Sequence, residues 1–412
     1  MLGSDGQMSW ATGKRMKTPF FRATILLLFL LLGLSALPAN VAASDRMQDE
    51  NDIKAVIDAY FTLRYEALKS LIPTDFLAVA DSTDAGAANW RRAEADRLGL
   101  RFTIARTFGD YVVDYKFFLD YIAIDVKNAK ATVTLLESNE ITYSSNPTDP
   151  SRMADLRHVI VLSHHQNRWG ILRDDYQDEL SDAIANSSQS EIDQNIINNH
   201  NGIHPDRSGD GETPPHSAAA DLKRFTYFNS AALAFANAYW NSVGPVPTVI
   251  RDTPGWDSSW PTNYKQYPRD CNNFISQAIF QGTSFTASDA NYPHPDSSHY
   301  TTQWYYKFST TTDGSLPWVN VGSFYAFLTG NLYGGLGRGP AGLRVDLCSP
   351  SLIYGNPIFM KTSTGWAHTV IIATNSGCNI AVNSHNVNYY HAPLSIFSAY
   401  SWYPIYIAGY FK

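Results

Sequence analysis

The stretch Asp270-Cys271-Asn272-Asn273-Phe274-Ile275-Ser276-Gln277 decides how the C-terminal half of the chain is interpreted. From Phe274 to Ile279 the apolar residues have the i, i+1, i+4, i+5 spacing of a buried helix, and Gly282 ends the pattern. This spacing places Cys271 in the first turn of that helix. Because a helix N-terminus stabilises an anion, we expect it to lower the pKa of the Cys271 thiol. The alternative is an unreactive cysteine buried beneath a helix.

The amino-terminal end is typical of a secretory signal peptide. Basic residues from Lys14 to Arg22 precede an apolar run of 14 residues, 23–36, and small residues follow up to Ala43. The run is too short to span a bilayer comfortably. We therefore predict that residues 1–43 are a signal peptide, that no stable membrane insertion follows cleavage, and that the protein is secreted or lies in the cell envelope.

The cysteine count gains meaning from this predicted export. The chain has three cysteines, Cys271, Cys348 and Cys378. In an oxidising compartment an odd number leaves at least one thiol free. Cys348 and Cys378 enclose a modest loop and could pair, which would leave Cys271 as the free thiol.

The overall composition indicates a globular protein of two or three domains. The 412 residues carry a net charge of −7, with 44% hydrophobic and 17% charged side chains. No stripe of Lys and Arg is present, so nucleic acid is not an expected partner. Aromatic residues make up 13% of the chain, which fits either ordinary core packing or a groove for a sugar or peptide. Nothing in the sequence indicates an oligomeric state.

Residues 46–182 are expected to form an α+β domain. An amphipathic helix covers residues 53–68 and a second helix residues 89–98. Strands are predicted at residues 117–126, 130–136, 140–144, 159–163 and 169–173, with hairpin turns at Asn128 and at Gln166-Asn167. This order resembles the cone-shaped, nuclear-transport-factor-like fold, in which a long helix crosses a curved antiparallel sheet. We expect this accessory domain to position, dimerise or shield rather than catalyse.

Residues 183–220 are polar and rich in Gly and Pro, which predicts a flexible linker. Asp206 to Glu212 only faintly resembles a calcium loop, because the spacing of its acidic residues is wrong. The pair His164-His165 in the preceding domain also lacks the spacing of metal ligands. No metal or cofactor is therefore expected.

Residues 221–412 are expected to combine helices with an antiparallel sheet. His368 opens one predicted strand, and Asn383 and His385 lie at the end of the next. In a hairpin centred on Gly377 these positions become neighbours. Because neither a Gly-x-Ser-x-Gly nor a His-Glu-x-x-His motif occurs, serine and zinc hydrolase chemistry is not indicated. The Gly-rich loop from Gly337 to Gly342 follows no strand and contains a proline, so we do not interpret it as a dinucleotide site.

A cysteine on a helix, a histidine on a later strand and a polar residue one strand further is the order found in papain-like thiol hydrolases. Over about residues 222–400 the chain also resembles the bacterial putative amidase domain, which is assigned to that superfamily. The motifs that carry the resemblance are FTYFNSAALAFANAYWN (225–241), DCNNFISQAIFQG (270–282), GWAHTVIIAT (365–374) and NSHN (383–386). Asn356 stands where that family usually carries an acid.

The resemblance implies a papain-like C-terminal domain that hydrolyses amides through a thiol. Cys271 is then the nucleophile and His368 the general base. Either His385, which we prefer because the family places a histidine there, or Asn383 orients the imidazole. The predicted substrate is a peptide or an amide of the cell wall. The alternatives are an inactive module that binds such material and an acyl transferase that uses the same Cys-His pair.

Four further residues are predicted to support this site. The backbone N–H of Cys271 and the side chain of Gln266 could stabilise the oxyanion. Asp270 is expected to be the N-cap of the helix or, alternatively, to modulate the thiol. Trp304 and Trp366 either line the substrate cleft or only pack beside it.

Overall fold

The structure is a computed structural model that describes residues 37–203, 222–246, 262–283, 301–307 and 313–412. The chain divides into two compact units, Met1–Ala55 and Val56–Lys412. In the first unit, the described residues form the beginning of helix α2 (Leu37–Ser70), which passes the predicted cleavage site without a break. The rest of the predicted signal peptide lies outside the described residues. No helix in the described ranges is both long and apolar enough to cross a membrane.

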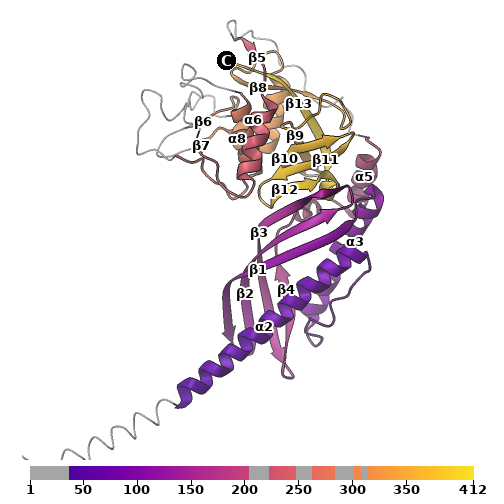
Figure 1. Cartoon of the computed structure of the whole chain (residues 1–412), viewed down its shortest axis with the longest axis vertical. Coiled ribbons are helices and arrows are strands. Elements are labelled where there is room, and N and C mark those ends of the chain that lie inside the picture. Colours follow the sequence, from indigo (N-terminus) through magenta and orange to yellow (C-terminus); the bar gives the residue numbers. More distant parts are fainter. Residues whose placement is uncertain (1–36, 204–221, 247–261, 284–300, 308–312) are drawn as a thin grey trace, which may run out of the picture. The chain divides into compact units, whose positions relative to one another are not determined.

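The first part of the second unit joins helices to an antiparallel sheet (Figure 1). Helix α3 packs on β4, and the end of α2 lies on β1, where the ring of Tyr65 stacks on that of Phe117 with centroids 5.1 Å apart. Both predicted hairpin turns are confirmed by the positive φ angles of Asn128, Gln166 and Asn167. The elements are α3 (Ala85–Phe108), β1 (Val112–Lys127), β2 (Lys130–Tyr143), β3 (Asn146–His165) and β4 (Arg168–Asp175).

Two predicted strands, 130–136 and 140–144, form the single strand β2. The polar residues between them do not end the strand. At this place the register of β2 with β3 is irregular, between Glu137 and Asn139. The pairing then continues on the far side. The predicted α+β class is confirmed.

A network of buried charges holds the interior of this part together. His158 lies between the carboxylates of Asp174, 2.8 Å from Nδ1, and Glu137, 2.9 Å from Nε2. Burial alone would lower the pKa of His158, but the two carboxylates raise it to about 9. All three residues are thus engaged with one another, which gives His158 a structural role.

The predicted flexible linker is wrong for its first part. Residues 181–200 form helices α4 (Ser181–Asn186) and α5 (Gln189–His200). Ile192 and Ile196 enter a hydrophobic core shared with the C-terminal strands, and Asn199 Nδ2 donates hydrogen bonds to the carbonyls of Ser398 and Tyr400. Two apolar residues at i and i+4 were enough to anchor an otherwise polar helix. Residues 204–221 lie outside the described residues.

The remaining described residues form helices followed by strands, as expected. Helix α8 begins at Cys271, and His368 lies in one strand of a pair whose second strand ends at Ser384, one residue before His385. The elements are β5 (Arg224–Phe225), α6 (Asn229–Tyr239), α8 (Cys271–Gly282), β6 (Tyr306–Lys307), β7 (Asp313–Gly314), α9 (Leu316–Val319), α10 (Val321–Gly330), β8 (Gly339–Arg344), β9 (Pro357–Thr362), β10 (Gly365–Ser376), β11 (Asn379–Ser384), β12 (Asn388–Pro393), the 3-10 helix η4 (Leu394–Phe397) and β13 (Ser401–Phe411).

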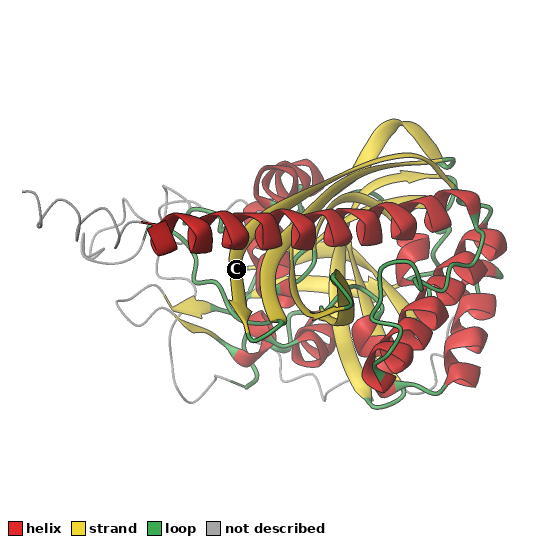
Figure 2. Ribbon diagram, turned by 90° about the horizontal axis from the view of Figure 1, so that it is seen from below, coloured by secondary structure: helices red, strands yellow, loops and turns green. Residues whose placement is uncertain are grey.

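One sheet runs through both parts of this unit. Its strand order is β1-β2-β3-β12-β11-β10-β9-β13-β5, with β4 on β3 and β8 on β13. The join is the antiparallel pairing of Asn388–Tyr390 in β12 with Arg152–Ala154 in β3 (Figures 1 and 2). The accessory strands therefore extend the C-terminal sheet.

Strand β10 separates two hydrophobic cores. Ile371 belongs to the core that also contains Cys271 and the apolar residues of α8. Val370 and Ile372 belong to the opposite core, with residues of α5 and η4. This alternation follows from the two-residue period of a strand, and it assigns each side chain of β10 to one face.

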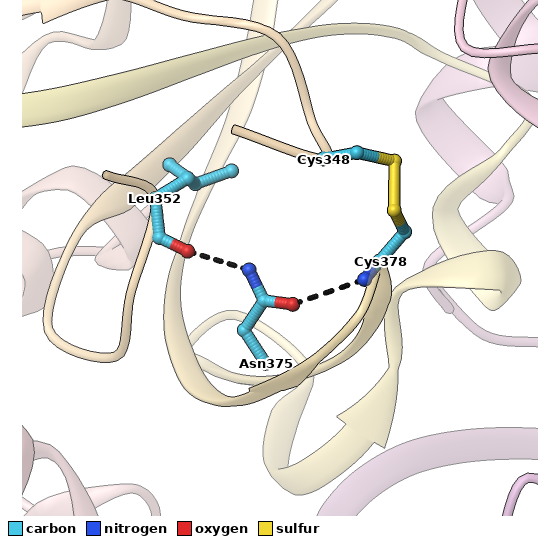
Figure 3. The surroundings of a disulfide bond; sticks show 4 residues. All are labelled: Cys348, Leu352, Asn375 and Cys378. Carbon is cyan, nitrogen blue, oxygen red and sulfur yellow. Dashed lines mark hydrogen bonds between the residues drawn. A yellow bond between two sulfur atoms is a disulfide. The ribbon is translucent and has the colours of Figure 1, made fainter. Parts of the chain in front are cut away.

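A disulfide joins Cys348, in the segment between β8 and β9, to Cys378 in the β10–β11 turn (Figure 3). Asn375 reinforces the same turn: its Nδ2 donates to the Leu352 carbonyl, and its Oδ1 accepts from the Cys378 N–H at 3.3 Å. Cys271 is free. The pairing considered from sequence is therefore confirmed.

Replacing both bridging cysteines, Cys348→Ser with Cys378→Ser, is expected to lower the free energy of unfolding by about 2–4 kcal/mol. The reason is that the crosslink spans 30 residues and restricts the unfolded chain. Urea unfolding of the double variant and of the oxidised wild type would measure this difference. An unchanged free energy of unfolding would show that the bridge contributes nothing to stability.

Candidate active site

The carboxylate of Asp270 fixes the start of helix α8. Its Oδ1 accepts from the Tyr267 N–H at 2.9 Å and from Asn273 Nδ2 at 2.7 Å, and its Oδ2 bonds Nδ1 of His385 at 3.0 Å. Asp270 is the N-cap residue of α8, as predicted, but its side chain makes no capping bond to the first-turn N–H groups. Asp270 instead ties the residue before Cys271 to the loop, to the helix and to the end of β11.

His385 is fully engaged in this arrangement. Its Nε2 lies 2.7 Å from the carbonyl of Tyr239 at the end of α6, and its ring stacks on Phe274 with centroids 3.9 Å apart. Each ring nitrogen thus has a protein partner, the Asp270 carboxylate or the Tyr239 carbonyl. His385 therefore positions α8 through Asp270, and its ring nitrogens do not contact His368.

Cys271 is the first residue of α8 and only 3% exposed. Burial raises the pKa of its thiol to about 12, whereas the nearby backbone N–H groups of Thr369 and Asn272 act to lower it. The carboxylates of Asp270 and Asp182 add to the increase. The predicted lowering of the thiol pKa is thus wrong for this arrangement, because burial outweighs the N–H groups at the helix start.

His368 lies in β10 opposite Met360, immediately before Thr369, whose backbone N–H acts to lower the pKa of the Cys271 thiol. Its ring is 9% exposed and stacks on Phe397 with centroids 5.6 Å apart. Burial lowers the pKa of this imidazole to about 4, so it is neutral at pH 7. Among the described residues, neither ring nitrogen has a hydrogen-bond partner.

The backbone that follows His368 lies near the thiol of Cys271, but the imidazole and the thiol are not bonded to each other. In the described parts of the chain, no hydrogen bond joins Cys271 Sγ to the ring of His368. The contacts explain this: Thr369 directs its hydroxyl to the α8 side, 3.4 Å from Asn272 Oδ1, while His368 lies on Phe397 on the other face. A register irregularity between Trp366 and His368 accompanies this orientation.

Asn383 also forms its hydrogen bonds with residues other than His368. It is opposite Ile371 rather than His368, its Nδ2 donates to Asn237 Oδ1 at 2.7 Å, and its Oδ1 accepts from the His391 N–H at 2.8 Å. Neither of the two residues considered as the third member of the triad thus touches the imidazole in this arrangement.

The remaining predicted site residues lie apart from the thiol. Gln266 is exposed on the loop before α8. Trp304 is fully buried, donates to Ser276 Oγ at 3.1 Å and stacks on Trp318, so it packs the core rather than lining a cleft. Trp366 packs on Tyr325, with centroids 4.4 Å apart. For Trp304 and Trp366, the packing alternative describes the contacts that the structure contains.

A cavity of about 380 Å³ opens beside His368. This volume lies within the range of small-molecule sites. Its walls come from three places: Pro268 and Arg269 just before α8, the turn at Asn386-Val387 together with Phe397 and Tyr400, and residues 177–182 after β4. The last group, which includes Asp182, was missed from the sequence because it belongs to the accessory part. Its only sequence signal was acidic residues at the domain boundary.

No group of three or more His, Cys, Asp or Glu side chains that could hold a metal ion is present in the described residues. The described lining of the cavity includes the imidazole of His368 and the carboxylates of Asp178, Glu179 and Asp182.

Residues 226–408 match the model of a protein family described as "Putative amidase domain". This part of the chain is similar to that family, and because of this similarity we call it the amidase domain. The match begins before α6 and ends within β13, so it includes Cys271, Asp270 and His368. No curated protein and no solved structure matched the chain. The papain-like and bacterial assignments of the amidase domain stay predictions.

The Cys271 thiol in the folded amidase domain is expected to react with iodoacetamide at pH 8 at least about 100-fold more slowly than in urea, because burial favours the neutral thiol. Timed alkylation followed by mass spectrometry would measure both rates. The Cys271→Ala variant is the control and should take up no label. Rapid labelling of the folded wild type would contradict the burial described here.

The His368 imidazole is expected to make folding sensitive to acid. Its pKa is about 4 when folded and about 6.5 when unfolded, so the unfolded chain binds the proton first as the pH falls. Stability is retained above pH 6.5 and lost toward pH 4, by roughly 2–3 kcal/mol between pH 7 and 4.5. Urea unfolding of wild type and His368→Phe would measure this, and the variant should lose less stability over that interval. Equal losses in both proteins would rule out the contribution of His368.

Proposed function

We propose that the amidase domain hydrolyses amides with Cys271 as nucleophile and His368 as general base. The observation that carries the proposal is the hydrogen bond from the Thr369 hydroxyl to Asn272 Oδ1 at 3.4 Å, because it joins the residue after His368 to the residue after Cys271, the free thiol. The cavity beside His368 supplies room for a substrate. The family match supports amide hydrolysis.

Both groups begin in their neutral forms in this proposal. Because the ring of His368 lies on the other face of β10 from the sulfur, the proposal requires a local change in the backbone of β10 that brings the imidazole from Phe397 to the thiol. Nε2 or Nδ1 then accepts the thiol proton while the sulfur attacks the amide carbonyl carbon. The protonated imidazole gives this proton to the leaving amine. A water molecule, deprotonated by the same imidazole, then attacks the thioester and releases the carboxylic acid and the thiol.

The start of α8 would stabilise the negative charge that develops on the carbonyl oxygen. A helix N-terminus offers N–H groups with no partner in the helix, and the backbone N–H of Cys271 is one of them in this proposal. Gln266, exposed on the preceding loop, is the side chain that we propose beside it. His385 and Asp270 hold this helix turn in place, and Asn383 holds the neighbouring strand.

The proposed substrate is a peptide or a cell-wall amide outside the cytoplasm. Two observations support export: the signal-like sequence of residues 1–43 and the Cys348–Cys378 disulfide, a bond that persists in oxidising compartments. The separation of His368 from Cys271 favours one alternative, a module that binds such material without cleaving it.

Cys271→Ala and His368→Ala are each expected to lower the rate of amide cleavage by at least about 100-fold, because one removes the nucleophile and the other the base. Mass spectrometry of products from cell-wall stem peptides and from simple peptide amides would measure the rates. His164→Ala, on the accessory strand β3, is the matched histidine control and should retain the wild-type rate.

If the Cys271→Ala variant cleaved the peptides at the wild-type rate, the thiol mechanism would be ruled out. If wild type and Cys271→Ala bind the peptides equally and neither releases a product, the binding module is the better description.

A further inference from the structure

The cavity contains a polar group that is built to meet a ligand. His368 is 91% buried, since 9% is exposed, and its ring nitrogens have no partner within the described ranges. Because His368 lines the cavity, its ring nitrogens are available to bond a molecule that enters it. The volume of about 380 Å³ fits part of a peptide.

Two of the three carboxylates on the accessory wall are already neutralised. Asp178 is held by Arg97 and by Arg101, with Oδ2 2.7 Å from Arg101 Nη2. Glu179 Oε1 forms an ion pair with the same Arg101, at 2.6 Å, without hydrogen-bond geometry, and Oε2 accepts from the hydroxyl of Tyr389. The charges of Asp178 and Glu179 are thus balanced by two arginines, so these carboxylates attract a cation weakly.

Asp182 is different because its neutralisation is weak. Its partner among the described residues is Arg269, with Nη2 at 3.7 Å from Oδ1. The Arg269 side chain is 78% exposed, so its charge is largely hydrated, whereas that of Asp182 is 32% exposed. An exposed pair at this distance contributes little. The carboxylate of Asp182 is thus the charged group on this wall that remains available.

We propose that Asp182 binds a positively charged amino group of the substrate, so that the cavity selects peptides with a primary ammonium beside the bond to be cleaved. This inference rests on the proposed function and names its substrate class. Asp182 lies in the first turn of α4, just after the accessory strands, so the accessory part supplies a specificity residue to the amidase domain.

The same carboxylate is coupled to the nucleophile. Asp182 is one of the groups that raise the pKa of the Cys271 thiol. An ammonium bound at Asp182 offsets this negative charge and so favours the thiolate. A cationic substrate would therefore both pair with the Asp182 carboxylate and ease the removal of the thiol proton.

The test measures binding by the full-length Cys271→Ala protein, so that it does not depend on cleavage. The probes are two fluorescent peptides that differ at one position, lysine in one and its neutral counterpart norleucine in the other. We expect the lysine peptide to bind more tightly, and adding Asp182→Asn to weaken its binding about five- to tenfold with little effect on norleucine. Arg269→Gln, which frees the carboxylate, should strengthen lysine binding.

Asp193→Asn, on the exposed face of α5, is the matched control for loss of a carboxylate and should change neither affinity. Circular dichroism would establish that each variant is folded. Equal binding of the two peptides, no binding of either, or equal effects of Asp182→Asn and Asp193→Asn would overturn the proposal. A wild-type protein that prefers lysine through Asp182 but cleaves neither peptide would remove the hydrolysis and leave the charge selection standing.

Discussion

The position of the candidate nucleophile depends on the buried carboxylate of Asp270. A buried carboxylate is tolerated only when its oxygens are bonded, and here the donors come from the preceding loop, from α8 itself and from His385 at the end of β11. The backbone N–H of Asp270 adds a bond to Asn386 Oδ1. Because these partners belong to different elements, any shift of the first turn of α8 would break several bonds together. The start of the helix is thereby held beside β10, where the Thr369 hydroxyl lies 3.4 Å from Asn272 Oδ1.

The pairing of β12 with β3 places residues of the accessory part at the cavity beside His368. It joins the two sheets edge to edge, and the hydroxyls of Tyr389 and Tyr400 then bond Glu179 from the C-terminal side. The segment 177–182 is held at the cavity by these contacts rather than by its own helix, which has only six residues. A domain that shares strands and buried hydrogen bonds with the amidase domain cannot be a loosely tethered attachment. The accessory part is therefore a component of the site.

Local patterns in the sequence were sufficient for the elements of the site but not for its orientation. The apolar spacing after Phe274 predicted α8, and the alternation around Val370 predicted β10, because both signals depend on neighbouring residues alone. The direction of the His368 ring depends instead on an irregularity in β10 that no local pattern announces. Since side chains alternate along a strand, one extra residue changes the face that the ring takes. The docking of α5 was hidden in the same way, because two isoleucines among polar residues resemble a connector until a partner surface is known.

The protonated thiol follows from where the fold places α8. Every residue of this helix except Gln281 is buried, so the helix start that would favour an anion is also removed from water. Charge near a helix N-terminus is stabilised by about 0.3–1 kcal/mol, whereas burying an unpaired charge costs several kcal/mol. Desolvation therefore wins at Cys271, and by the same argument the imidazole of His368 stays neutral. Two neutral groups cannot attract each other as an ion pair would, which agrees with a ring that rests on Phe397. A charged ligand in the cavity, or water that solvates the sulfur, would then change the balance between thiol and thiolate.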